Sequence, residues 1–236
     1  GKKVKDSAER TEGVTPVCGI ARTENLSDRS FPVYSSFKNV KTLPDAIIDF
    51  SSPEVLEELL SFAEENGIPA VLCVTGYTES QLKRINAAAE KTAIFLSSNT
   101  SLGVYVLRRA VTLAAKELKD FDAEIIEIHH AAKKDAPSGT ALALANDVKS
   151  ARENAAFVFG RKGYAPRDKN EIGVHSVRGG NVTGEHTVIF AGENETLTFT
   201  HSATDKSVFA AGAIKAAIFV SDKKRGLYGM KDLFGE

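Results

Sequence analysis

The chain has 236 residues, with 30 Lys and Arg against 31 Asp and Glu, so its formal net charge at pH 7 is −1. This balance excludes bulk electrostatic attraction to nucleic acid or to an anionic membrane, and only two cysteines exclude a disulfide framework and a four-cysteine zinc site. No apolar run approaches the roughly 20 residues of a membrane-spanning helix, and the sequence opens without a basic and apolar leader, so we expect a cytoplasmic protein of one or two domains.

The first hundred residues alternate short apolar runs with amphipathic helices. The predicted strands cover 15–21, 46–50, 70–74 and 93–96, and helices are predicted from Ser52-Pro53 to Asn66-Gly67 and over 79–91. Short strands that alternate with helices of about a dozen residues predict a parallel sheet with right-handed crossovers. Ligands of such sheets bind beyond the carboxyl ends of the strands.

After Asn99 the pattern changes to one that is richer in strands. A helix over 104–118 leads to a strand over 124–128, and a further helix opens at Ser138. The later strands are predicted at 172–177, 187–191 and 196–200, followed by a last helix over 207–220. Threonines alternate with apolar residues in 196–200, which predicts an open sheet with one face exposed to solvent.

The stretch EIIEIHHAAKKDAPSGTA, residues 124–141, carries most of the chemistry. A strand ends in His129 and His130, which should point to opposite sides, and Lys133 follows closely. The helix start at 138–140 offers backbone N–H groups and the positive end of the helix dipole, which suit a carboxylate or a phosphate. A histidine titrates near neutral pH and can deliver a proton. The stretch therefore predicts an anion-binding site with a proton donor beside it.

Several residues have an ordinary structural interpretation as well. Glu127 could orient His129 or be a simple carboxylate at a strand edge. Residues 184–186 (GEH) open a hairpin and could have a structural role alone. Cys18 and Cys73 lie in predicted strands, and we expect their small side chains to pack in the hydrophobic core. A metal site is not expected, because no third His, Cys or carboxylate has ligand spacing and Lys133 would repel a cation.

The segment HHAAKKDAPSGTA resembles the signature H-H-x-x-K-x-D-A-P-S-G-T-A of the 4-hydroxy-tetrahydrodipicolinate reductase (dihydrodipicolinate reductase) family. The likeness extends in order and spacing over essentially the whole chain, including Asp49-Phe50-Ser51, Thr75-Gly76, Ser98-Asn99, Gly184-Glu185-His186 and 226–233. The resemblance implies an NAD(P)H-dependent oxidoreductase of lysine and diaminopimelate biosynthesis, which adds hydride to the ring C=N of a cyclic dicarboxylate.

The same resemblance implies an α/β fold with two domains and a homotetramer. Residues 1–99 and 206–236 would form a Rossmann-like, parallel-sheet dinucleotide-binding domain. Residues 100–205 would form an α+β domain with a mixed or antiparallel sheet, which binds substrate and makes the oligomer interface.

Functional residues are carried over only where the sequence matches the family pattern. His129 would be the proton donor and Lys133 would assist it. The residues that would hold the dicarboxylate are His130, Lys133, Ser138, Gly139 and Thr140. The residues that would line the cofactor site are Gly1, Arg22, Thr75, Ser97, Ser98, Asn99, Thr100 and Lys206.

The sequence also departs from the family pattern. Family members begin with a strand and a glycine-rich phosphate loop, of which Gly1 resembles the last glycine, and we expect the natural protein to contain the rest. The place about 20 residues after Gly1, where a carboxylate would bind the ribose hydroxyls, is occupied by Ala21 and Arg22. Arg22 could instead contact a 2′-phosphate, which favours NADPH at least as much as NADH, or be a surface arginine. Lys206 replaces an arginine common in the family and loses its two-pronged hydrogen bonding.

Two alternative functions remain open at this point. The chain could be another two-domain NAD(P)-dependent dehydrogenase, against which the linked His129, His130 and Lys133 argue. It could also be a non-catalytic relative that binds ligand without turnover.

Overall fold

The computed structural model describes residues 1–21 and 30–235. The chain divides into two compact units, each of which is described by itself. One unit combines Gly1–Ser101 with Ser207–Glu236, and the other spans Leu102–Lys206. Both ends of the chain thus contribute to the same unit.

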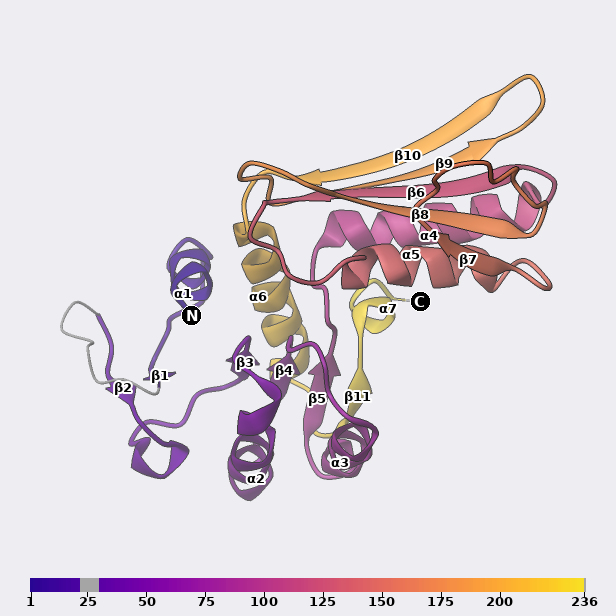
Figure 1. Cartoon of the computed structure of the whole chain (residues 1–236). Helices are drawn as coiled ribbons and strands as arrows, with labels where there is room; N and C mark the ends of the chain where they lie inside the picture. The colour runs from indigo at the N-terminus through magenta and orange to yellow at the C-terminus, as the bar shows by residue number, and fades with distance from the viewer. Residues whose placement is uncertain (22–29, 236) are drawn as a thin grey trace. The chain divides into compact units, whose positions relative to one another are not determined.

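The first unit is built on a four-stranded sheet in which neighbouring strands are parallel. In spatial order the strands are β11 (Gly226–Tyr228), β5 (Ala93–Leu96), β4 (Ala70–Leu72) and β3 (Ile47–Asp49). The helices lie on both faces, with α2 (Leu56–Asn66) and α3 (Glu79–Ala89) on one and α6 (Ser207–Ser221) on the other (Figure 1). Burial of both faces explains the continuous apolar runs of these strands.

The helices of this unit follow local signals, with one correction. The helix predicted to start at Ser52-Pro53 is instead a 3₁₀ turn, Pro53–Val55, and α2 begins at Leu56. As predicted, Gly67 ends α2, in the left-handed conformation with φ of 64°. Thr78 begins α3 with a capping box, in which its side chain accepts from the Gln81 N–H.

The predicted strand over 15–21 is wrong in extent. Only β1 (Gly19–Ile20) forms there, and it pairs in parallel with β2 (Val33–Tyr34), which sequence reasoning missed. Cys18 therefore lies outside a core strand and is half-buried, whereas Cys73 follows β4 and is buried. Burial raises the pKa of both thiols, that of Cys73 to about 12, so Cys73 is a neutral core residue at pH 7. The remaining elements of the unit are α1 (Lys2–Ala8), η1 (Phe37–Asn39) and α7 (Met230–Leu233).

The second unit is built on a five-stranded mixed sheet in the order β10-β9-β6-β8-β7. Its strands are β6 (Asp122–His129), β7 (Ala156–Phe159), β8 (Glu171–Arg178), β9 (Gly184–Ala191) and β10 (Thr196–Ala203). Strand β6 runs parallel to β8 and antiparallel to β9. Helices α4 (Leu102–Glu117) and α5 (Gly139–Lys149) cover one face of this sheet (Figure 1). The predicted fold class, a parallel-sheet unit plus a unit with a mixed sheet, is confirmed.

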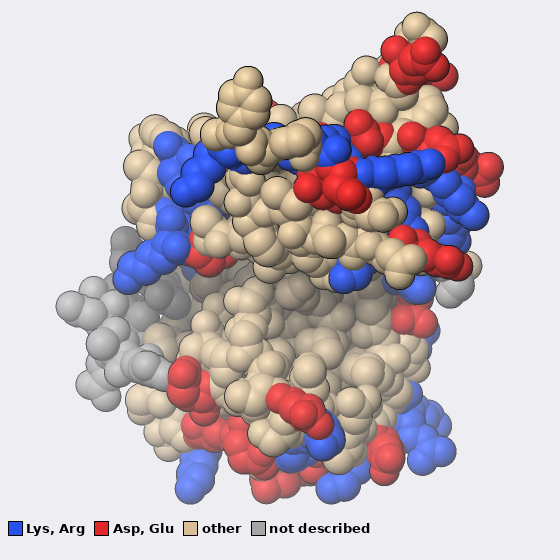
Figure 2. Space-filling model, turned by 45° about the vertical axis from the view of Figure 1, so that its right-hand side comes forward, with Lys and Arg blue, Asp and Glu red and all other residues tan. Residues whose placement is uncertain are grey.

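The charged side chains of the surface are of both signs. Figure 2 shows Lys and Arg intermingled with Asp and Glu over the face in view, in line with the near-zero net charge. Among the described residues, no helix has the length and apolar character needed to cross a membrane.

Candidate active site

The candidate site is built on β6, the central strand of the second unit. Buried and half-buried residues alternate along this strand, and Ala123, Ile125, Glu127 and His129 form its buried side. The first two belong to the core under α4 and α5. The strand thus carries a carboxylate and an imidazole on its core-facing side, at positions where the alternation favours apolar residues.

The Glu127 side chain is fully buried and accepts hydrogen bonds on both oxygens. Arg178 donates to Oε1 and Oε2 at 2.7 and 2.8 Å, the Ser138 N–H donates to Oε1 at 3.1 Å, and His129 Nδ1 lies 2.5 Å from Oε2. Burial by itself raises the pKa of Glu127, but these hydrogen bonds outweigh it and lower that pKa to about 2. Glu127 is therefore an ionised carboxylate, and its interpretation as a strand-edge residue is wrong because β6 is a central strand.

His129 is 8% exposed and is held by this carboxylate. An ionised carboxylate only accepts hydrogen bonds, so His129 donates from Nδ1 and keeps Nε2 for proton exchange. Burial lowers the pKa of His129, the Glu127 carboxylate opposes that shift, and the cations Lys133 and Arg178 add to it. The ring is therefore neutral at pH 7 before a ligand binds. A methyl group placed on Gly184 of β9 would lie 2.9 Å from Nε2, so the glycine leaves room for the ring.

Lys133 and His130 follow the end of β6. The Lys133 backbone N–H donates to the His130 carbonyl at 3.1 Å. Lys133 Nζ donates to both carboxylate oxygens of Asp135 at 2.8 Å, which lowers the pKa of Asp135. The cation predicted to meet an anion is thus paired with an exposed carboxylate, which an incoming anion would have to replace or share.

Ser138 begins helix α5, as predicted. Its Oγ accepts from the Ala141 N–H at 3.1 Å and lies 2.9 Å from Nε2 of His186. A side chain at Gly139 would meet no described atom within 4 Å, so the helix start is accessible to a ligand at this position. Because the Ser138 N–H also donates to Glu127, one carboxylate ties the helix start to His129.

Sequence reasoning missed two members of this cluster, His186 and Arg178. His186 lies opposite Glu127 in the β6–β9 ladder, and its ring contacts that of His129 edge-on with centroids 5.2 Å apart. His186 stands in the Gly184-Glu185-His186 segment that resembles the family pattern, and a second signal is its position in β9, where the strand alternation favours an apolar residue. Arg178 ends β8, opposite His129 in the parallel ladder, and no local pattern connects it to Glu127.

The predicted cofactor residues lie mostly in the first unit. Thr75 is exposed after β4, beside Gly76 with φ of 83°, and the segment 97–100 follows β5. In this segment Ser97 donates to the Asn99 carbonyl at 2.7 Å, and the buried Thr100 donates to the Phe209 carbonyl at 2.6 Å. The Thr100 side chain therefore links the segment 97–100 to helix α6 by a hydrogen bond.

Three further predicted cofactor residues lie elsewhere. Gly1 precedes α1 and is exposed, Lys206 is exposed in the second unit, and Arg22 lies outside the described residues.

The edge of the first sheet fits a ligand rich in hydroxyl groups. Among the described residues, Oδ2 of Asp49, the last residue of β3, and the Tyr77 hydroxyl are buried without a hydrogen-bond partner. The exposed Thr75 and Ser98 follow β4 and β5, at the same carboxyl ends of strands. A parallel sheet binds dinucleotides at this edge, so the residues present fit the adenosine and nicotinamide cofactors of dehydrogenases.

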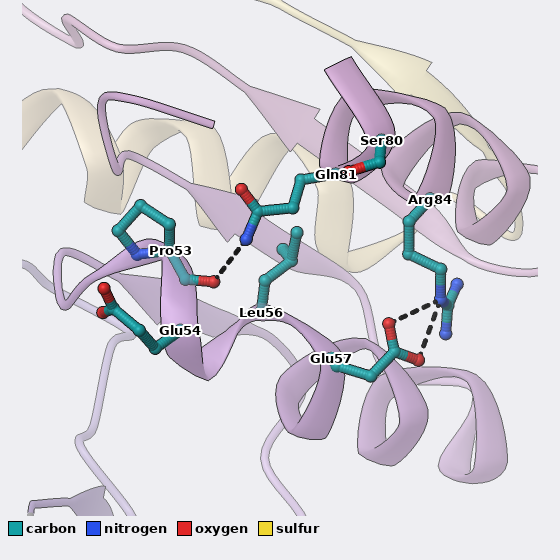
Figure 3. Close-up of a pocket in the computed structure, with 7 residues that line it drawn as sticks. All are labelled: Pro53, Glu54, Leu56, Glu57, Ser80, Gln81 and Arg84. Carbon is teal, nitrogen blue, oxygen red and sulfur yellow. Dashed lines mark hydrogen bonds and ion pairs between the residues drawn. The ribbon is translucent and has the colours of Figure 1, made fainter. Parts of the chain in front are cut away.

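A separate pocket of about 290 Å³ lies between the start of α2 and α3 (Figure 3). Gln81 donates to the Pro53 carbonyl at 2.8 Å on one side, and Arg84 pairs with Glu57 at 3.0 Å on the other. None of the predicted site residues lines this pocket. It is therefore a surface feature separate from the cluster around His129.

A parallel-sheet unit with a polar carboxyl edge, together with a unit that carries a buried carboxylate–histidine pair beside a helix start, defines a two-domain nicotinamide-dependent oxidoreductase. Models of the N-terminus and the C-terminus of dihydrodipicolinate reductase match residues 1–100 and 103–234. The chain belongs to the dihydrodipicolinate reductase family. The enzymes of this family use NADH or NADPH in lysine and diaminopimelate biosynthesis.

Individual relatives agree with this assignment. The 4-hydroxy-tetrahydrodipicolinate reductase of Clostridium novyi strain NT is 40% identical over 99% of this chain and 93% of its own length. That of Caldanaerobacter subterraneus subsp. tengcongensis is 46% identical with the same coverage. A dipicolinate-bound dihydrodipicolinate reductase from Paenisporosarcina sp. TG-14 shares the fold, with a TM-score of 0.81 at 24% identity over 98% of this chain and 94% of that one. The predicted family is confirmed.

Proposed function

We propose that the chain reduces 4-hydroxy-tetrahydrodipicolinate to tetrahydrodipicolinate, with hydride added to the ring C=N system and His129 as the proton donor. The 4-hydroxyl group leaves as water, which gives a C=C bond conjugated to the ring C=N. Hydride adds to the carbon that lost the hydroxyl group, and the electrons move through the conjugated bonds onto the ring nitrogen, where the proton is added. The net reaction therefore consumes one hydride and one proton and releases water. The observation that carries the proposal is the buried Glu127–His129 pair, which leaves Nε2 of His129 free of Glu127 beside Lys133 and the start of α5.

The charge of the substrate switches His129 from neutral to protonated. Two carboxylates beside the ring favour the imidazolium form, and the fixed Glu127 carboxylate stabilises the same charge through Nδ1. Nε2 then carries the proton that quenches the negative charge on the ring nitrogen. Lys133 assists by exchanging its pairing with Asp135 for a substrate carboxylate, and His130, Ser138, Gly139 and Thr140 complete the carboxylate site.

The bound nicotinamide cofactor supplies the hydride. The side chains and backbone that would hold it are Gly1, Thr75, Ser97, Ser98, Asn99 and Lys206, with Thr100 as a support for their loop. The contact between Arg22 and a 2′-phosphate, and with it the use of NADPH at least as well as NADH, stays a prediction.

We also propose that the protein is a homotetramer and that it is located in the cytoplasm. One face of the second sheet lies under α4 and α5, and the opposite face carries the half-buried Ile126, Ile128 and Ile189 and the 46%-exposed Val177. The same face carries Glu124, Glu185, Thr187 and His175, so a second copy of the chain would cover a face of mixed character and bury these apolar side chains. Light scattering of the purified protein measures the mass, and a monomer at micromolar concentration would contradict this part.

The test of the function is NADPH oxidation with freshly made 4-hydroxy-tetrahydrodipicolinate. We expect turnover by the wild type and a kcat lower by about 10²- to 10⁴-fold for His129→Gln, the range of a lost general acid. Turnover of other keto or imino acids but not of the cyclic dicarboxylate would favour a different dehydrogenase. Stabilisation by ligand without turnover would favour a non-catalytic binding protein.

A further inference from the structure

The Ser138 hydroxyl group has a defined set of neighbours. Its oxygen accepts from the Ala141 N–H at 3.1 Å and lies 2.9 Å from Nε2 of His186. A serine hydroxyl has one hydrogen and two lone pairs. The direction of its hydrogen therefore depends on whether His186 donates to Ser138 or accepts from it.

The burial of His186 decides between these two arrangements. His186 is 5% exposed, and within the described part of the chain its Nδ1 has no hydrogen-bond partner. Burial, and then the neighbouring His129, lower the pKa of His186 to about 4, so its ring carries a single hydrogen at pH 7. If Ser138 donated to Nε2, that hydrogen would be on Nδ1 as a buried N–H without an acceptor, an arrangement that is rare in proteins. The hydrogen is therefore on Nε2.

We propose that His186 is a positioning residue: it donates from Nε2 to Ser138 and so directs the Ser138 hydroxyl hydrogen to a carboxylate of the bound substrate. Both lone pairs of the hydroxyl are then occupied, by Ala141 and by His186. The hydroxyl can act only as a donor, and its hydrogen has no acceptor among the described side chains of the cluster until an anion binds.

This arrangement has a consequence for specificity. A hydroxyl that can only donate binds a charged carboxylate oxygen more strongly than the neutral carbonyl oxygen of a carboxamide, and it offers no acceptor to a carboxamide NH₂ group. The inference rests on the proposed function, in which Ser138 binds the dicarboxylate.

The protonation of His186 can be measured directly. In protein labelled with ¹⁵N-histidine, long-range ¹H–¹⁵N correlation spectra distinguish the two neutral forms of the ring, and the signal lost in His186→Gln identifies His186. We expect the hydrogen on Nε2 at pH 7. A hydrogen on Nδ1 would overturn the inference, whatever the protein turns over.

The effect on ligand binding is measured with dipicolinate, a stable cyclic dicarboxylate, by titration calorimetry. His186→Leu removes the donor, and we expect a dissociation constant about three- to tenfold higher, the value of one ordinary hydrogen bond. His186→Gln keeps an N–H near the position of Nε2 and should bind within about twofold of the wild type. In a Ser138→Ala background, His186→Leu should cause no further loss.

The outcomes separate this inference from the proposed function. An equal loss for His186→Leu with and without Ser138 would show a general structural role and overturn the inference, even in an active enzyme. Binding of dipicolinate with the expected coupling but no reduction of 4-hydroxy-tetrahydrodipicolinate by the wild type would overturn only the proposed function. If His186→Leu does not fold, the spectrum of the wild type and the affinity of His186→Gln still decide.

Discussion

The two sheets of this chain place polar groups in different ways. The parallel sheet of the first unit has helices on both faces, and Ala70, Val71 and Leu72 of β4 are all fully buried. Its candidate ligand-binding residues therefore follow the strands, as Thr75 and Ser98 do. In the second unit, β6 carries Glu127 and His129 within the strand itself.

The difference teaches where a buried charge can be tolerated. Glu127 is ionised inside a core because the end of β8 and the start of α5 both supply donors to it. In the first sheet the buried Asp49 lies at the last position of β3 and accepts from the Ser51 N–H and hydroxyl group, whereas β4 and β5 have apolar neighbours on both faces. The proposed catalytic groups are thus rigid parts of the second sheet, whereas the proposed cofactor residues Thr75 and Ser98 of the first unit lie on loops after the strands.

The largest effect is expected for Glu127→Gln. Gln keeps the size of the side chain but removes the charge and replaces one acceptor oxygen by an NH₂ donor, so Arg178 is left without its anion and the protonated form of His129 loses its stabilising carboxylate. We expect kcat to fall about 10²- to 10⁴-fold and the free energy of unfolding to fall by about 3 kcal/mol, the lower end for a broken buried pair. Single-turnover kinetics and urea unfolding measure these changes. A variant with wild-type kcat would contradict the role of the carboxylate.

Gly184→Ala tests the rigidity of His129 without removing a polar group. The added methyl group would lie 2.9 Å from Nε2, and the ring cannot move aside without leaving Glu127. We expect kcat to fall by at least about tenfold, in line with a displacement of the general acid. Gly179→Ala is the matched control, because a methyl group there meets no described atom within 4 Å. Equal activity of the two variants would show that His129 is not held in place.

Gly212→Ala makes the corresponding test in the first unit. A methyl group on Gly212 of α6 would lie 1.8 Å from the Thr100 carbonyl oxygen, a contact that forces the helix and the loop apart. We expect a loss of about 1–3 kcal/mol in the free energy of unfolding and a higher KM for NADPH, with unchanged affinity for dipicolinate. Lys215→Ala on the same helix is exposed and should be neutral within about 0.5 kcal/mol. A weaker affinity of Gly212→Ala for dipicolinate would contradict the proposal that the first unit binds the cofactor and the second unit binds the dicarboxylate.

The smallest effect is expected for Thr78→Ala. The change removes the capping box of α3, in which Thr78 and Gln81 exchange hydrogen bonds. A loss of about 1 kcal/mol in the free energy of unfolding is expected, with no change in kcat. Thermal unfolding monitored by circular dichroism measures it, and a loss of activity at full occupancy of both substrates would connect α3 to the chemistry.

The sequence predicted the elements whose signals are local. The amphipathic helix that ends at Gly67, with Leu56, Leu59, Leu60 and Ala63 buried, and the start of α5 at Ser138 are both found. The strand over 15–21 failed in extent because an apolar run does not show which of its residues find a partner strand. Strand β11 was missed because Gly226–Tyr228 is short and joins the sheet only through pairing with β5.

The candidate site was predictable only in part for the same reason. His129, Lys133 and Ser138 lie within ten residues and share one motif, so their association is visible in the sequence. Arg178 and His186 reach the cluster from β8 and β9 through strand register, and register is a property of the folded sheet. The ionisation of Glu127 depends on Arg178 and was invisible for that reason.

The most direct test of the account is the pH dependence of kcat/KM for the wild type and for His129→Gln. A general acid must carry its proton, and burial together with Lys133 and Arg178 lowers the pKa of His129 in the free enzyme below its ordinary value. We therefore expect kcat/KM of the wild type to fall as the pH rises through that lowered pKa, below about 6.5. This fall should be absent in His129→Gln, whose activity is low at every pH. The same fall in both proteins would contradict the assignment of His129 as the proton donor.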